Sequence, residues 1–143
     1  MIRFIYNGEA VGKGRPRVSR RGNYVHTYTP SKTRDFEESI RFEFMANNCD
    51  PMPVYKREVS LKASVLIGVP IPKSYSKKKR KMCIDGELVP AKKPDVDNIL
   101  KAVFDALQGY AYEDDCQIVV IHSEKMYSES PFVEVVIDEY KRT

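Results

Sequence analysis

The order of apolar patterns along the chain restricts its fold most, because helix and strand periodicities alternate over most of its length. Two stretches have the apolar stripe of an amphipathic helix: residues 30–47 and 96–108. Strand patterns surround them at residues 2–7, 23–28, 58–69, 117–127 and 132–140. The 143 residues can fill one ordinary core. We therefore predict an α+β fold, a single domain over 1–143 with a small mixed sheet and helices packed on it.

Local signals refine these elements. Thr29 and Pro30 predict a helix start, with Thr29 as the N-cap and Pro30 at the first helical position. Glu37 and Arg41 are four residues apart and predict an ion pair on the solvent side of that helix. Four further segments are interpreted from their turn residues: a loop at 8–22, a surface excursion at 70–93 with a short basic helix near 76–82, a loop at 110–116, and a hairpin turn at 128–131.

Positive charge is clustered along the chain. The formal net charge is only +4, which many proteins reach, so its distribution is more informative than its size. Each of these cations, taken singly, is more often solvated than in contact with a ligand. Together they predict a surface that binds DNA phosphates through these residues: Lys13, Arg15, Arg17, Arg20, Arg21, Lys77, Lys78, Lys79, Arg80, Lys92 and Lys93.

Several classes of protein are disfavoured by the sequence. The three cysteines are widely spaced and contain no CxxC pair, which argues against a zinc knuckle and a disulfide framework. No apolar run approaches the ~20 residues of a membrane span, and the N-terminus lacks the apolar core of a signal peptide. We therefore expect a cytoplasmic protein with no membrane partner and no small-molecule cofactor.

Carboxylates are concentrated between residues 93 and 115. Asp95 and Asp97 stand at the predicted start of the second helix, where two aspartates can converge on one cation. Ordinary capping explains one of them, but two such close like charges repel unless a cation lies between them. Lys101 is one turn beyond Asp97, which allows either a surface helix pair or contact with a phosphate oxygen.

A second acidic group, Glu113-Asp114-Asp115, follows the helix. It is either a solvated turn or the source of a third metal ligand. Three carboxylates and few histidines favour Mg²⁺, with Mn²⁺ as the alternative, over zinc. Such a site beside basic loops indicates a phosphodiester substrate, because a bound metal activates water and stabilises the leaving oxygen.

The segment KPDVDNILKAVFDALQG, followed by YAYEDDCQIV, resembles the RusA family of Holliday-junction resolvases. Members carry the pattern D-x-D-N-x-x-K-x-x-x-D-A-L and then a D-D pair before a strand. The matching residues are Asp95, Asp97, Asn98, Lys101, Asp105, Ala106, Leu107, Asp114 and Asp115. The segments GKGRPR (12–17) and YTPSKTRDFE (28–37) are also similar to members of this family, particularly those found on prophages.

This resemblance implies a small mixed-sheet fold and a homodimer that makes paired nicks across a four-way DNA junction. It implies metal ligands at Asp95, Asp97 and Asp115, with Asp114 the less secure of the loop pair, and a functional lysine at Lys101. We interpret Asp105 as structural, because it lies ~12 Å along the helix from Asp97. Some members carry arginines before the first aspartate, whereas here the positive charge comes from residues 77–81, which are four lysines and Arg80, and from Lys92 and Lys93.

Two other functions are also compatible with the sequence. One is a branched-DNA-binding module without catalysis, which would keep the basic residues and need no metal. The other is a metal-dependent nuclease that acts on flaps.

Overall fold

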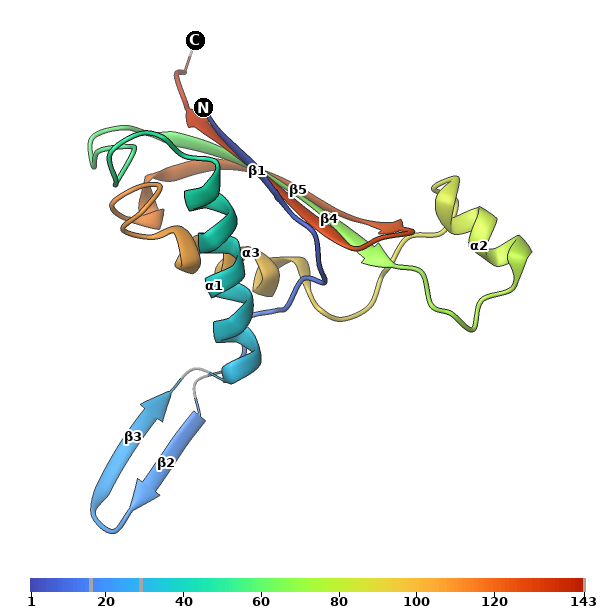
Figure 1. The fold of residues 1–143 in the computed structure, drawn as a ribbon, viewed down its shortest axis with the longest axis horizontal. Coiled ribbons are helices and arrows are strands. Elements are labelled where there is room, and N and C mark those ends of the chain that lie inside the picture. The colour runs from blue at the N-terminus through green and yellow to red at the C-terminus, as the bar shows by residue number, and fades with distance from the viewer. Residues whose placement is uncertain (16, 29, 143) are drawn as a thin grey trace.

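The structure is a computed structural model that describes residues 1–15, 17–28 and 30–142, with Arg17 described only by its backbone. Its body is a four-stranded sheet with helices packed against it, and two segments project from this body (Figure 1). The α+β fold with a mixed sheet is therefore confirmed. Among the described residues, no helix combines the length and apolar character that crossing a membrane requires.

The long fourth strand is central to the sheet. The order is β1-β6-β4-β5, and only the β4–β5 pair is parallel. In β4 the side chains at every second position are buried against the helices, as the period-two pattern predicts. The strands are β1 (Ile2–Tyr6), β4 (Leu61–Pro70), β5 (Ile118–Ser128) and β6 (Phe132–Glu139).

The predicted hairpin between the last two strands is wrong, because β4 lies between them. Val65 of β4 is opposite Ser123 of β5 on one side and Val135 of β6 on the other. The connection at 129–131 therefore crosses the end of β4 instead of joining paired neighbours. β4 ends at Pro70, which has no N–H with which to extend the ladder.

Two helices pack on the sheet, and their stripes are buried as predicted. They are α1 (Ser31–Ala46), which buries Phe36, Ile40 and Phe44, and α3 (Val96–Leu107). Pro30 has extended backbone at the N-cap, so α1 starts one residue later than predicted. The predicted N-cap residue, Thr29, lies outside the described residues.

The predicted pair between Glu37 and Arg41 is wrong, because both side chains face α3 instead of solvent. Arg41 Nε donates a hydrogen bond to the Ala106 carbonyl (3.0 Å), and its guanidinium lies 4.8 Å from the centre of the Tyr110 ring. Glu37 instead accepts from the Lys13 ammonium. The body is held by one hydrophobic core with residues from β1, α1, β4, α3 and β6.

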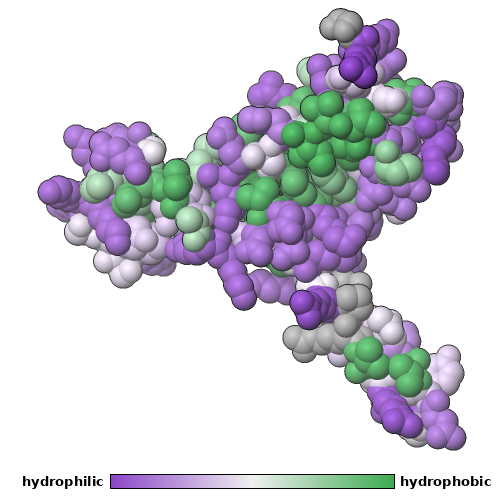
Figure 2. Space-filling model, turned by 180° about the vertical axis from the view of Figure 1, so that it is seen from behind, coloured by the Kyte–Doolittle hydropathy of each residue, from purple (hydrophilic) through white to green (hydrophobic). Residues whose placement is uncertain are grey.

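A β-hairpin occupies part of the segment that we predicted to be a loop. Its strands are β2 (Arg17–Arg21) and β3 (Tyr24–Tyr28), of which only β3 matches a predicted strand. Gly22, with a φ of +59°, and Asn23 form the two-residue turn. The prediction for 17–21 was wrong because four charged or polar residues conceal the alternation of a strand that has no buried face. The hairpin extends away from α1 as a separate arm (Figures 1 and 2).

The other projection is the predicted basic helix. Helix α2 (Lys77–Ile84) begins at Ser76, whose side chain accepts a hydrogen bond from the Lys79 N–H (3.2 Å). It lies at the opposite side of the body from the hairpin (Figure 1). The lysine run and the N-terminal basic segment therefore form two separate basic surfaces.

The buried end of α3 provides a stability prediction. Tyr112 is fully buried, and its hydroxyl donates to the Phe104 carbonyl (2.7 Å) in the last turn of α3. We expect Tyr112→Phe to lower the free energy of unfolding by about 1–3 kcal/mol, because a buried carbonyl loses its donor. Urea denaturation measures this loss. Tyr110→Phe, at a half-buried ring, is the matched control and is expected to change stability by less than about 0.5 kcal/mol; equal effects of both variants would contradict the prediction.

Candidate active site

Asp95 and Asp97 lie at the N-terminal end of α3, as predicted. Asp95 is the N-cap, but its side chain makes no capping hydrogen bond. Asp97 lies in the first turn, and both side chains are exposed. Among the described residues, neither carboxylate takes part in a hydrogen bond or ion pair. Ordinary helix capping therefore does not account for this pair.

A lysine from the sheet holds the chain just before these aspartates. Lys125 of β5 donates through Nζ to the carbonyl oxygens of Lys92 (2.5 Å) and Pro94 (2.9 Å). Because Pro94 directly precedes Asp95, this contact fixes where α3 begins relative to the sheet. Lys125 was not predicted as a site residue, because a single lysine in a strand carries no signal of its partners.

Lys13 connects the N-terminal segment to both helices. Its N–H donates to the Asn98 carbonyl (2.8 Å), and its Nζ lies 2.5 Å from Glu37 Oε1 and 3.3 Å from Asp105 Oδ2. Burial opposes its charge, but the carboxylates of Glu37 and Asp105 outweigh that effect and raise the pKa of Lys13. These contacts give Lys13 a structural role, and its predicted contact with DNA stays a prediction.

Lys101 pairs with a different aspartate from the one its spacing suggested. Its Nζ lies 4.0 Å from Asp105 Oδ2, one turn towards the C-terminus, and most of its side chain is exposed. Asp97, Lys101 and Asp105 follow one another at four-residue spacing, so they form a polar stripe along α3. Lys101 therefore lies between the two acidic groups with its ammonium accessible to solvent.

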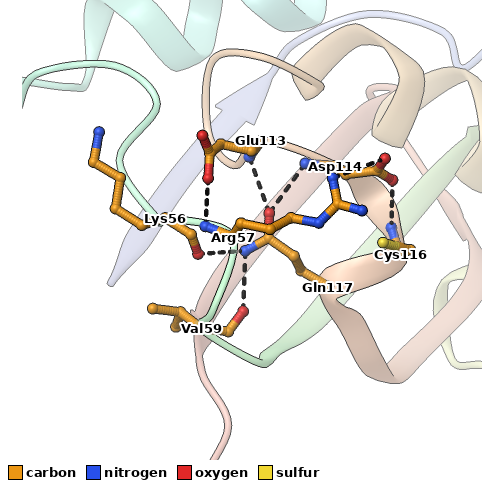
Figure 3. Close-up of polar contacts among 7 residues, drawn as sticks. All are labelled: Lys56, Arg57, Val59, Glu113, Asp114, Cys116 and Gln117. Carbon is orange, nitrogen blue, oxygen red and sulfur yellow. Dashed lines mark hydrogen bonds and ion pairs between the residues drawn. The ribbon is translucent and has the colours of Figure 1, made fainter.

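Gln117 organises the loop after α3 (Figure 3). Its buried side-chain oxygen accepts from the N–H groups of Glu113 and Asp114, both at 3.0 Å. Its side-chain nitrogen donates to the carbonyls of Lys56 (2.8 Å) and Val59 (3.0 Å). The acidic loop is thereby fixed to the segment that leads into β4. No local pattern in the sequence predicts this contact.

The two aspartates of this loop differ in their environment. Asp114 caps the short 3-10 turn η1 (Asp115–Gln117): it accepts from the Cys116 N–H (3.0 Å) and lies 3.4 Å from Arg57 Nη1 (Figure 3). The Cys116 hydrogen bond and the Arg57 charge hold the pKa of Asp114 below its usual range. Both side-chain oxygens of Asp114 therefore already have partners within the protein.

Asp115 has a more acidic environment. Burial, a hydrogen bond with Asp114 and the negative charges of Asp105 and Asp114 raise the pKa of Asp115, against the opposing charge of Lys101. Asp105, which we interpreted as structural, thus forms part of the electrostatic environment of Asp115. It also binds Lys13, which agrees with a structural role.

The predicted ligands fall into two groups along α3. Asp95 and Asp97 lie at its N-terminal end, and Asp115 lies within electrostatic range of Asp105 and Lys101. Within residues 1–15, 17–28 and 30–142, no three His, Cys, Asp or Glu side chains come close enough together to hold a metal ion. The arrangement is a row of carboxylates along one helix, not a closed ligand cluster.

A hollow of about 450 Å³ lies beside the first acidic group. The N-terminal segment forms one wall, and the residues before α3 form the other. Three lysines line it together with Glu9 and Asp95, and because the Lys13 ammonium already pairs with Glu37 and Asp105, the remaining charges balance. The lining residues are Glu9, Ala10, Val11, Gly12, Lys13, Lys32, Lys93, Pro94, Asp95 and Asn98.

The other predicted DNA-binding residues are distributed over the projections and the strand-to-helix connection. Arg15, Arg20 and Arg21 are exposed at or near the hairpin, and Lys77, Lys78 and Lys79 are exposed on α2, where Arg80 is half-buried. Lys92 and Lys93 are exposed just before α3. The side chain of Arg17 lies outside the described residues.

Comparison with known proteins identifies the family. A family model described as "Endodeoxyribonuclease RusA" matches residues 7–138. The chain belongs to the RusA endodeoxyribonuclease family. It is also 41% identical over 138 residues to "Uncharacterized protein YqaN" of Bacillus subtilis (strain 168), with 96% of each chain covered. The resemblance found in the sequence is confirmed, and membership of RusA indicates a DNA endonuclease.

In this RusA member, the contacts of Lys13 predict its contribution to stability. We expect Lys13→Met to lower the free energy of unfolding by about 1–3 kcal/mol, since two carboxylates lose their cation. Lys32→Met, at an exposed position of α1, should change stability by less than about 0.5 kcal/mol.

The effect of Lys13→Met should also depend on pH. A raised lysine pKa stabilises the folded state fully below the unfolded value of about 10.4, and this stabilisation is lost as pH rises through the folded value. The difference from the unmodified chain, measured by urea denaturation, should therefore be constant near neutral pH and shrink above about pH 10.4. A difference that is already lost at neutral pH would contradict this role.

Proposed function

We propose that this protein is a metal-dependent endonuclease that resolves four-way DNA junctions by paired, symmetric nicks. The carboxylate row along α3 carries this proposal: Asp95 and Asp97 have no described partner, and Asp115 lies among further carboxylates. Negative charge on two exposed carboxylates this close together repels itself unless a cation lies between them. Its presence beside cationic projections supports a catalytic use.

The residues fit a hard divalent cation in their chemistry. Asp95 and Asp97 at the start of α3, and Asp115 in the second acidic group, would supply carboxylate oxygens to Mg²⁺, or to Mn²⁺ as the alternative, although the three do not form one closed cluster among the described residues. The ion would supply Lewis acidity at the scissile phosphate and lower the pKa of a bound water. Asp114 is not included, because its oxygens already bind Cys116 and Arg57.

The other groups act on the DNA itself. Lys101 lies between the two acidic groups and is exposed, so its ammonium can bind a phosphate oxygen and orient the scissile bond. Lys125 positions Asp95 through the backbone before α3. Cations on the hairpin, on α2 and at residues 92–93 bind phosphates away from the reacting bond and offset the repulsion between DNA and the carboxylates.

A homodimer is part of this proposal, because one small site makes one nick and symmetric resolution needs two. The body offers apolar surface for a second copy: Val119, Val120 and Ile121 are exposed on β5, at an edge of the sheet. Figure 2 shows a large hydrophobic area on the body. Sedimentation velocity at micromolar concentration measures whether the protein is a dimer.

The catalytic proposal predicts a separation of cutting from binding. Asp97→Asn should reduce cleavage of a synthetic four-way junction in Mg²⁺ by at least about a hundred-fold, because a metal ligand is lost. Junction binding should be kept or tightened, since repulsion of phosphate is reduced. Asp50→Asn, in the loop after α1, is the matched control and should cut normally. Flap and linear duplex substrates are compared in the same assay.

The outcomes of this assay discriminate among the functions. Normal cutting by Asp97→Asn would remove Asp97 from the site. Junction binding without cleavage at any concentration of Mg²⁺ or Mn²⁺ would favour a binding module. Faster cutting of flaps than of junctions would overturn the substrate assignment.

The role of α2 is tested by salt dependence. Lys77→Ala combined with Lys78→Ala should make the slope of log affinity against log salt less steep by about 1.8, because each phosphate contact contributes about 0.9. Alanine keeps the helix propensity of these positions. Fluorescence anisotropy with a labelled junction measures the slope, and Lys62→Ala on β4 is the control. An unchanged slope would remove these two lysines from the DNA-contacting surface.

A further inference from the structure

The two faces of the β2–β3 hairpin differ in chemistry. The register pairs Ser19 with His26 and Arg21 with Tyr24, so these side chains share one face of the hairpin. Tyr28 lies on the same face, two residues beyond His26. We call this the aromatic face and define it by five residues: Ser19, Arg21, Tyr24, His26 and Tyr28. The opposite face carries Val18, Arg20, Val25 and Thr27.

The aromatic face is concave and uncovered. Its five residues line an open hollow of about 560 Å³. Tyr24 is 74% exposed, and the rings of His26 and Tyr28 are nearly parallel, with 14° between their planes and 6.3 Å between their centres. A two-stranded hairpin without a second layer is marginal in water, and aromatic rings in this position contribute no buried core. Stability of the body therefore does not explain these three rings.

The charge around the hairpin selects the kind of partner. From residue 10 to residue 34 the sequence contains seven lysines and arginines and no aspartate or glutamate. Such a segment attracts a polyanion and disfavours the approach of a second copy of the same segment. Cations combined with exposed aromatic rings are the combination that binds unpaired nucleic-acid bases, because rings stack on bases while cations hold the backbone.

The base of the hairpin is fixed near the carboxylates. Gly14 N–H donates to Thr33 Oγ1 (3.1 Å), and Lys13 N–H donates to the Asn98 carbonyl in the first turn of α3. A methyl group at Gly12 would lie 3.1 Å from Asn98 Cβ, so the backbone packs closely against the start of α3. The chain that leads into the arm is therefore held beside the start of α3, near Asp95.

We propose that the aromatic face stacks on bases that become exposed at the branch point of DNA, and that this contact gives the protein its preference for branched over linear DNA. The inference rests on the proposed function and names the part of the substrate that the arm recognises. In a regular duplex the bases are already stacked, so the rings gain little there. At a branch the bases are accessible at lower cost, and stacking is independent of sequence.

The test compares a labelled four-way junction with a linear duplex of the same arm sequences, both in EDTA so that only binding is measured. Tyr24→Thr combined with Tyr28→Thr removes both phenol rings, and threonine keeps strand propensity. We expect junction affinity to fall by at least about twenty-five-fold, because each of the two rings contributes about five-fold or more by stacking on a base. Duplex affinity should change less than about two-fold.

Two matched controls separate stacking from hairpin structure. Tyr24→Phe combined with Tyr28→Phe keeps both rings and should bind the junction like the unmodified chain. Val25→Ala combined with Thr27→Ala alters the same strand on the opposite face and should also leave the preference for the junction unchanged. Circular dichroism of each variant checks that the body remains folded.

Each outcome has a distinct meaning. An unmodified chain that neither prefers nor cuts the junction overturns the proposed function. If that chain prefers and cuts the junction but the threonine variant keeps the same preference, only the stacking role is overturned. Equal losses on junction and duplex would overturn it in favour of a general phosphate-binding or structural role. A change in sedimentation confined to the threonine variant would show that the arm contacts another copy, which also overturns it.

Discussion

The contact of the Lys13 ammonium with Glu37 on α1 and Asp105 on α3 is the interaction on which the arrangement of the site depends. Both helices bury one stripe against the sheet, so their facing polar sides must either be hydrated or be bridged. Lys13 bridges them from the N-terminal segment. The same residue holds the base of the hairpin beside the start of α3 through its backbone. Lys13 thus connects both helices through its side chain and holds the segment before the arm at the start of α3 through its backbone.

The carboxylates along α3 differ in whether a lysine compensates their charge. Asp105 receives Lys13 and Lys101, which compensates one of the negative charges in the middle of the row. The ends stay uncompensated: Asp95 and Asp97 have no described partner, and the neighbours of Asp115 are mostly acidic. Charges that repel in the folded state are a cost to stability, and proteins keep such sites where a ligand offsets them. The distribution of lysines therefore indicates which carboxylates serve the fold and which are available to a cation.

Every element that buries an apolar pattern was predicted, whereas β2, which buries none, was missed. The stripe of Phe36, Ile40 and Phe44 located α1 because only one register buries all three. The hairpin strand β2 has no buried face, so its alternation carried no signal. The place of β4 between β5 and β6 depends on long-range pairing, which no local pattern contains. In the site, the aspartates at the start of α3 could be located from the sequence. The different environments of Asp114 and Asp115 could not, because they depend on contacts with Gln117 and Arg57 that no local pattern predicts.

The separation of cations from carboxylates follows from the chemistry of a DNA backbone. A carboxylate site repels phosphate, so affinity for DNA must come from elsewhere on the surface. If the cations lay within the carboxylate row, they would neutralise the aspartates and compete with a metal ion. Among the described residues of the row, Lys13 and Lys101 pair only with Asp105, and most of the other predicted DNA-binding cations lie on the hairpin and on α2, on opposite sides of the body (Figure 1). Two separated basic projections can bind two segments of DNA at once, and a branch presents several segments close together. Under the proposed function, the same separation that preserves the charge of the site would therefore favour a branched substrate over a linear one.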